Sequence, residues 1–225
     1  MARAVSIVQM DSRKTGRRIL HASALSPGLP HANGNAFSYV LPCHVEDLLK
    51  IGFSTNPLRR FETFHSRYYD VFDLDRGFLI ETDRVAEARE VERTLMRDID
   101  AHNAPAPATI RPGAAGDTEW YRGAYAHALE TGSTLARQCG YALRAPLREW
   151  LRQQLVAQAP LLYEWSAQAF ALLAAEHIDL RNDDDAQRFS RQLIDRADAY
   201  AALGVEIDEF VTASFHDWYR AQIRA

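Results

Sequence analysis

A helix predicted over residues 84–100 carries a carboxylate on its apolar side. With an advance of about 100° per residue and Val85 at zero, an apolar stripe about 100° wide is formed by Ala88, Leu95, Met96 and Ile99. Glu92 falls inside this stripe, whereas the other charged residues of the segment lie outside it. A buried carboxylate without a partner is costly, so Glu92 needs an arginine or a metal ion. Pairing with an arginine would only stabilise the fold, whereas binding of a metal ion would make Glu92 part of a functional site.

The segments before this helix predict a small sheet. Residues 37–41 and 48–53 are rich in aromatic and β-branched side chains, and two strands this close in sequence are expected to be antiparallel. Asn56 is a candidate helix cap, and Pro57 suits the first helical position. Residues 77–80 are predicted to form a third strand.

The segments after it predict helices. Residues 103–118 contain several Pro and Gly residues and are expected to form a loop, directly before Glu119, Trp120 and Tyr121. We expect helices over residues 120–138, 146–158, 161–177, 185–203 and 206–223. The predicted fold class is therefore α+β: a domain over residues 37–123, with a three-stranded antiparallel sheet flanked by helices, followed by an all-α domain over residues 124–225.

Composition excludes several classes of protein. The 225 residues include two cysteines, Cys43 and Cys139, which is too few for a disulfide framework or a four-cysteine zinc site. No apolar run is long enough to span a membrane, and no secretory signal is visible, so we expect a cytoplasmic protein. The helical domain is expected to have its own core, with homodimer formation as a second interpretation of its apolar stripes.

Charge is distributed unevenly along the chain. The net charge of −4 argues against a strongly basic coat, but residues 1–36 hold five basic residues against one acidic residue. This basic N-terminal arm is suited to non-specific contact with a phosphate backbone, or is simply a solvated leader.

Five short motifs follow one another at characteristic spacings. Phe37-Ser38-Tyr39-Val40 is followed eleven residues later by Lys50-Ile51-Gly52-Phe53, and then by Ser54-Thr55-Asn56. Arg60 lies eight residues after Gly52 on the next predicted helix, Glu92 stands in an Ala-x-x-x-Glu-x-x-Leu setting, and Glu119-Trp120-Tyr121 comes last. In this order the residues resemble the GIY-YIG endonuclease superfamily, in particular the branch with a Lys-Ile-Gly second motif and a Glu-Trp-Phe distal motif.

The resemblance implies a domain that hydrolyses phosphodiester bonds of nucleic acid, with DNA favoured over RNA. It implies that Glu92 holds one Mg²⁺ or Mn²⁺ ion and that Arg60 binds a phosphate oxygen. Gly52, Asn56, Glu119 and Trp120 match structural positions of the motifs. The second-motif tyrosine is Lys50 here, and the family histidine corresponds to Phe64, so His65 is the neighbouring catalytic candidate.

Several roles stay open at this stage. Tyr39 would orient the attacking water or act as the base, which requires a cation to lower its ordinary pKa of about 10. Lys50 would supply that cation or be the base itself. Arg59, Arg60 and Arg67 are candidate nucleic-acid-binding residues. The alternative function is a binding module of the same fold that has lost cleavage and holds nucleic acid or a protein, for instance in a phage, mobile element or effector protein.

Overall fold

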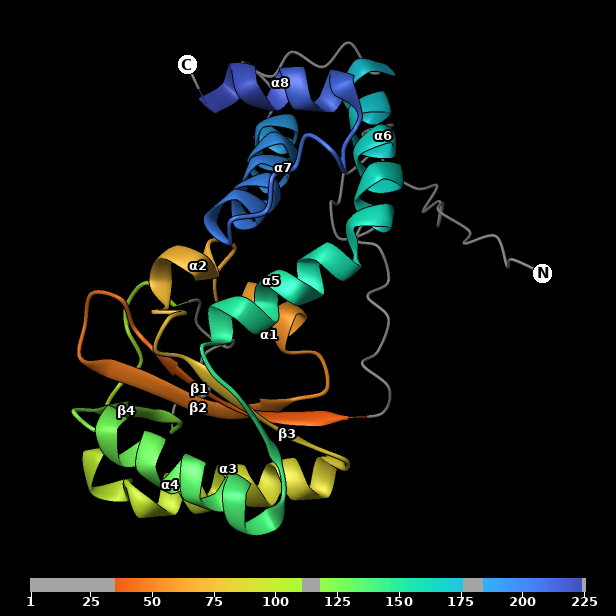
Figure 1. Ribbon diagram of the computed structural model, residues 1–225. Coiled ribbons are helices and arrows are strands. Elements are labelled where there is room, and N and C mark those ends of the chain that lie inside the picture. The colour runs from red at the N-terminus through yellow and green to blue at the C-terminus, as the bar shows by residue number, and fades with distance from the viewer. Residues whose placement is uncertain (1–34, 111–117, 176–183, 224–225) are drawn as a thin grey trace, which may run out of the picture. The chain divides into compact units, whose positions relative to one another are not determined.

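A five-stranded antiparallel sheet, in the order β4-β2-β1-β3-β5, is the central element of the structure (Figure 1). In this computed structural model, the described residues are 35–110, 118–175 and 184–223. Nearly all of the basic N-terminal arm predicted over residues 1–36 therefore lies outside the described residues. The strands are β1 (Ala36–Pro42), β2 (Leu48–Ser54), β3 (Phe78–Thr82), β4 (Trp120–Arg122) and β5 (Ala142–Arg144).

The first two strands confirm the predicted antiparallel pair. Their register places Tyr39 opposite Gly52 and Leu41 opposite Lys50. Because side chains alternate between the two faces of a strand, Lys50 and Gly52 point to the same face of the sheet as Tyr39.

Helices α3 (Val85–Asp98) and α4 (Tyr125–Cys139) cover one face of the sheet (Figure 1). A single apolar core joins them to the strands, and it includes Val40, Ile51, Phe78, Ile80, Val91, Leu95, Ile99 and Tyr121. Val91 is buried and Val85 is 37% exposed, so the buried stripe of α3 is rotated from the expected one. Glu92 consequently lies at the margin of this stripe, half-buried, rather than at its centre.

Helices α1 (Pro57–Phe64), α2 (Tyr68–Val71) and α5 (Leu147–Ala157) lie on the other face (Figure 1). The Asn56 side chain caps α1, as predicted, by accepting the Arg59 backbone N–H at 3.1 Å. Aromatic side chains fill the space between these helices and the sheet, among them Tyr39, Phe61, Phe64, Tyr68, Phe72 and Trp120.

Two of the fold predictions were wrong. The sheet has five strands instead of three, because residues 120–122 pair with β2 as β4 and residues 142–144 pair with β3 as β5. Both segments are only three residues long, which is too short for their own periodicity to identify them as strands. The expected helix over 120–138 begins at Tyr125 instead, and a short 3₁₀ helix (Asp100–His102) follows α3.

The remaining helices are α6 (Ala159–Ala175), α7 (Asp184–Ala202) and α8 (Ala213–Ile223), so the last predicted helix begins later than expected. Among the described residues, those of 35–159 and 195–207 form one compact unit, and those of 160–194 and 208–223 form a second. The first unit thus includes α4, β5 and α5. In the second, Trp165 packs edge-on against Phe215. None of the described helices has the length and apolar character that a membrane crossing requires.

Candidate active site at the edge of the sheet

Tyr39 lies over the backbone of Gly52 in the centre of the β1–β2 pair. A methyl group at position 52 would overlap the Tyr39 hydroxyl and ring, so only glycine leaves room for this phenol. Tyr39 is 1% exposed, and burial raises the pKa of its hydroxyl well above the usual range even though the Arg60 guanidinium donates a hydrogen bond to it. The tyrosine is therefore a neutral phenol at physiological pH.

Lys50 lies on the same face as Tyr39 and is fully buried. Its Nζ donates to Glu119 Oε2 at 2.7 Å and lies 5.2 Å from the ring centres of both Phe64 and Trp120. Burial lowers the pKa of Lys50, and the hydrogen bond to Glu119 counteracts this effect. The lysine is thus held in an aromatic pocket with one carboxylate as its anion.

Arg60 extends from α1 toward the same place. Its guanidinium carbon lies 4.5 Å from the centre of the Phe64 ring, the ring that also faces Lys50. From this place beside the ring, one guanidinium N–H donates to Tyr39, and Nη1 donates to the Thr63 hydroxyl at 3.4 Å. Arg60 is half-buried, which leaves part of it open to solvent.

Glu92 approaches from α3, on the opposite face of the sheet. Its carboxylate accepts the backbone N–H of Phe53, and burial together with the nearby Glu119 charge raises the pKa of Glu92 to about 7. Lys50 and Arg89 act in the opposite direction but do not cancel this effect. The ionised form of Glu92 is thus disfavoured in the protein alone, and a bound cation would stabilise it.

The short length of β4 explains how Glu92, from one face of the sheet, comes near Lys50 and Tyr39 on the other face. β4 pairs with β2 only along residues 48–50, and beyond this point the Ile51 N–H donates to the Glu119 carbonyl at 3.0 Å. The next N–H on that side, from Phe53, is taken by Glu92. Among the described residues, no strand therefore pairs with the edge of β2 beyond the end of β4, and α3 reaches the edge there.

Electrostatic interactions connect the side chains at this edge. The charges of Glu92 and Glu119 act on Tyr39, and those of Arg60 and Glu92 act on Lys50. The structure therefore brings together four residues that the sequence proposed for chemistry, which are Tyr39, Lys50, Arg60 and Glu92. It adds Glu119, whose side chain the sequence motif suggested only as a structural element or helix cap.

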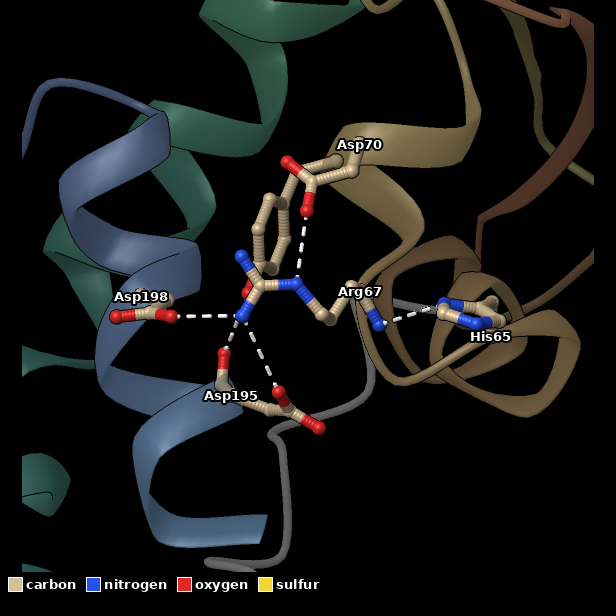
Figure 2. A network of polar contacts seen from close by, with 6 residues as sticks. His65, Arg67, Asp70, Asp195 and Asp198 are labelled. Carbon is tan, nitrogen blue, oxygen red and sulfur yellow. Dashed lines mark hydrogen bonds and ion pairs between the residues drawn. The ribbon is translucent and has the colours of Figure 1, made fainter. Parts of the chain in front are cut away.

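His65 and Arg67 take part in a different set of contacts (Figure 2). His65 ends α1, and its Nδ1 accepts the Arg67 backbone N–H at 3.0 Å. The Arg67 guanidinium is bound by Asp70 at 2.8 Å and, from α7, by Asp198 at 2.7 Å and Asp195 at 3.3 Å. These carboxylates raise the pKa of Arg67 and neutralise its charge locally. Arg59 lies exposed on α1.

The residues at this edge suit a hard divalent cation that needs one or two protein carboxylates better than a metal ion that needs three or more protein ligands. Within the described ranges, no cluster of three or more His, Cys, Asp or Glu side chains is arranged to hold a metal ion. Mg²⁺, however, needs only one or two carboxylates because it keeps several of its waters. Glu92 would be such a carboxylate. Burial and the neighbouring Glu119 both disfavour its negative charge, and a bound cation would offset this effect.

Fold and site together define a small α+β domain in which a tyrosine, a lysine, an arginine and two glutamates meet at an open sheet edge. Residues 36–136 match the family model of the T5orf172 domain, a range that runs from the start of β1 into α4 and covers a little under half of the chain. No curated protein and no solved structure matches the chain.

Proposed function

We propose that the protein is a metal-dependent endonuclease that hydrolyses phosphodiester bonds of nucleic acid, with DNA as the favoured substrate. The T5orf172 domain is phage-associated and commonly linked to GIY-YIG-like or HNH-like nucleases, which supports a nuclease-like or DNA-binding role. The observation that carries the proposal is the convergence of Tyr39, Lys50, Arg60 and Glu92, from four different elements, at one edge of the sheet.

In the proposed reaction Arg60 binds a non-bridging phosphate oxygen through its guanidinium. Stacking on Phe64 and the hydrogen bond to Tyr39 hold the guanidinium in one orientation before the substrate arrives. Such preorganisation is what makes a hydrogen-bond donor effective at a developing negative charge. Glu92 would hold a divalent cation, which would supply further charge relief on the phosphate and the leaving oxygen.

We assign the base to Lys50 rather than to Tyr39. Burial raises the pKa of Tyr39 and lowers that of Lys50, so the lysine gives up its proton more readily than a lysine in water, whereas the tyrosine does not. Glu119, 2.7 Å from Nζ, orients the Lys50 amine. Tyr39 then acts as a positioning residue for Arg60.

The test is cleavage of plasmid DNA, and of RNA, in Mg²⁺ or Mn²⁺. We expect Glu92→Gln and Arg60→Gln to reduce cleavage by about 100-fold or more, as loss of a charge-stabilising group does. Glu149→Gln and Arg152→Gln are matched controls, since both residues are exposed on α5. Equal cleavage by all four variants would overturn the proposal.

The same experiment separates the two candidate bases. Lys50→Met is expected to lose about 10²–10⁴-fold in rate, the contribution of a general base. Tyr39→Phe keeps the ring over Gly52, loses only the contact to Arg60, and is expected to lose about tenfold in cleavage rate.

The full burial of Tyr39 and Lys50 favours the binding module without cleavage as the second candidate function. Binding of DNA with no cleavage in any metal would support it.

A further inference from the structure

A row of arginines runs along the exposed side of α3, beside Glu92. Arg89, Arg93 and Arg97 are spaced four residues apart, and all three are exposed. Side chains at this spacing lie one above the other on the same side of a helix. The row covers about 12 Å of helix length, over which a nucleic-acid duplex carries about seven phosphates.

The row begins at the candidate active site. The Arg89 guanidinium carbon lies 4.8 Å from the centre of the Phe53 ring, and Phe53 donates its backbone N–H to Glu92. The charge of Arg89 also acts directly on Glu92. A strand that followed the row would therefore pass Glu92 at the open edge of β2.

Two acidic residues next to the row already have partners. Glu90 binds Arg93 Nη2 at 2.6 Å and Arg93 Nε donates to the Arg89 carbonyl at 3.3 Å, which leaves the Nη1 side of that guanidinium for other acceptors. Asp98, next to Arg97, is bound by the His127 and Thr131 side chains of α4. The row thus places three guanidinium groups along one side of α3 even though the chain as a whole is acidic.

We propose that Arg89, Arg93 and Arg97 form the surface that binds the phosphate backbone of the nucleic-acid substrate and leads it to Glu92. This inference rests on the proposed function and gives it a substrate-binding surface. Guanidinium groups suit phosphate because their planar fork donates two parallel hydrogen bonds to its oxygens. Contacts of this kind are independent of base sequence and strengthen as salt is lowered.

The test is the salt dependence of binding, measured by fluorescence anisotropy with a labelled 20-base-pair DNA duplex, in EDTA so that cleavage does not interfere. Replacing all three arginines by glutamine is expected to weaken binding at least about tenfold and to reduce the slope of log K against log salt by about 2–3. Arg97→Gln alone, at an exposed position far from Glu92 along the helix, is expected to reduce the slope by about 1. Arg152→Gln, on the other face of the sheet, is the matched control.

The outcomes distinguish this inference from the proposed function. Binding that depends on the row, without cleavage in any metal, would overturn the nuclease and keep the surface. If the unsubstituted protein cleaves DNA but the triple variant binds with the same salt slope as the Arg152→Gln control, the surface is overturned and the nuclease is kept. Absence of binding by the unsubstituted protein, or equal affinity for an oligoglutamate of the same charge, would overturn the surface as well. An RNA duplex of the same sequence shows which backbone is preferred.

Discussion

At the scale of single residues, Gly52 and Tyr39 form one structural unit. The two lie opposite each other in the β1–β2 register, and the phenol occupies the space that a side chain at position 52 would need. Glycine is required here for close approach of a neighbouring ring, not for an unusual backbone conformation. The motif glycine therefore determines where the Tyr39 hydroxyl lies, and through it the position of Arg60.

We predict that Gly52→Ala destabilises the protein by about 1–3 kcal/mol, the usual cost of overpacking a rigid core. The cost should fall in a Tyr39→Leu background, because the atoms that the new methyl group meets are those at the end of the tyrosine ring. Urea unfolding of the two single variants and the double variant measures the coupling. Strictly additive effects would show that the methyl group clashes with something other than Tyr39.

Glu92 is the second residue whose environment has a measurable consequence. Its pKa of about 7 lies above that of an unfolded glutamate, about 4.3, so the folded state binds the Glu92 proton more tightly. The stability that this proton contributes is complete below the unfolded pKa and is lost as the pH rises through about 7.

We therefore predict that Glu92→Gln, which keeps an acceptor for the Phe53 N–H, becomes the more stable protein above pH 7. The quantity to compare is the free energy of unfolding of the variant minus that of the unsubstituted chain. Because Glu92 is partly exposed, we expect this difference to be about 1–2 kcal/mol more favourable to the variant at pH 8 than at pH 4. Urea unfolding in EDTA at pH 4, 6 and 8 gives the profile. A difference that stays constant with pH would show that Glu92 titrates normally.

The same substitution tests the metal by a measurement other than activity. Mg²⁺ or Mn²⁺ that binds only the folded protein raises its melting temperature, by an amount that grows with the concentration of the cation. We expect this rise at pH 8 in the unsubstituted protein and in Glu149→Gln, and not in Glu92→Gln. An equal rise in all three would place the bound cation elsewhere.

At the scale of elements, the ion pair between Lys50 and Glu119 joins β2 to the start of β4. Lys50 is fully buried, whereas the Glu119 side chain is 30% exposed, so the ion pair joins a buried ammonium to a carboxylate that solvent reaches. β4 has only three residues, so this ion pair adds to the few backbone hydrogen bonds that hold it at the edge of the sheet.

We predict that Glu119→Gln destabilises the protein by about 2 kcal/mol, because it removes the carboxylate that the buried Lys50 ammonium binds at 2.7 Å. Lys50→Met/Glu119→Gln should recover much of this loss, since the methionine fills the same aromatic pocket without a charge. Denaturant unfolding at pH 7 compares the variants. A double variant that is less stable than Glu119→Gln would contradict the prediction.

At the scale of the whole molecule, the C-terminal half of α7 belongs to the compact unit that contains the sheet. Arg67 contributes to this attachment, because Asp195 and Asp198 both bind its guanidinium, and Tyr69 adds a hydrogen bond to the Asp195 carbonyl (Figure 2). An arginine proposed from sequence for nucleic-acid contact is thus placed where it holds the chain's own helix.

We predict that Asp195→Asn/Asp198→Asn increases amide hydrogen exchange over residues 195–207 and leaves that of β1 and β2 unchanged. Arg67 is partly exposed, so the loss of global stability should be no more than about 1 kcal/mol, and local opening is the more sensitive measurement. Asp217→Asn, at a highly exposed position on α8, is the control. Unchanged protection in the double variant would show that packing alone holds the helix.

Local patterns were sufficient to predict the first strand pair, the start of α1 and four of the five residues at the sheet edge. The β1–β2 pair and the Asn56 cap follow from patterns only a few residues long, whereas Glu92, expected inside the apolar stripe of its helix, lies at the margin of that stripe. Tertiary structure alone decided the two short outer strands, because a three-residue strand is stabilised by its neighbour and not by its own propensity. It also decided the burial of Lys50, its pairing with Glu119 and the binding of Arg67 to α7. These contacts join residues between 69 and 131 positions apart, a separation over which no local pattern carries information.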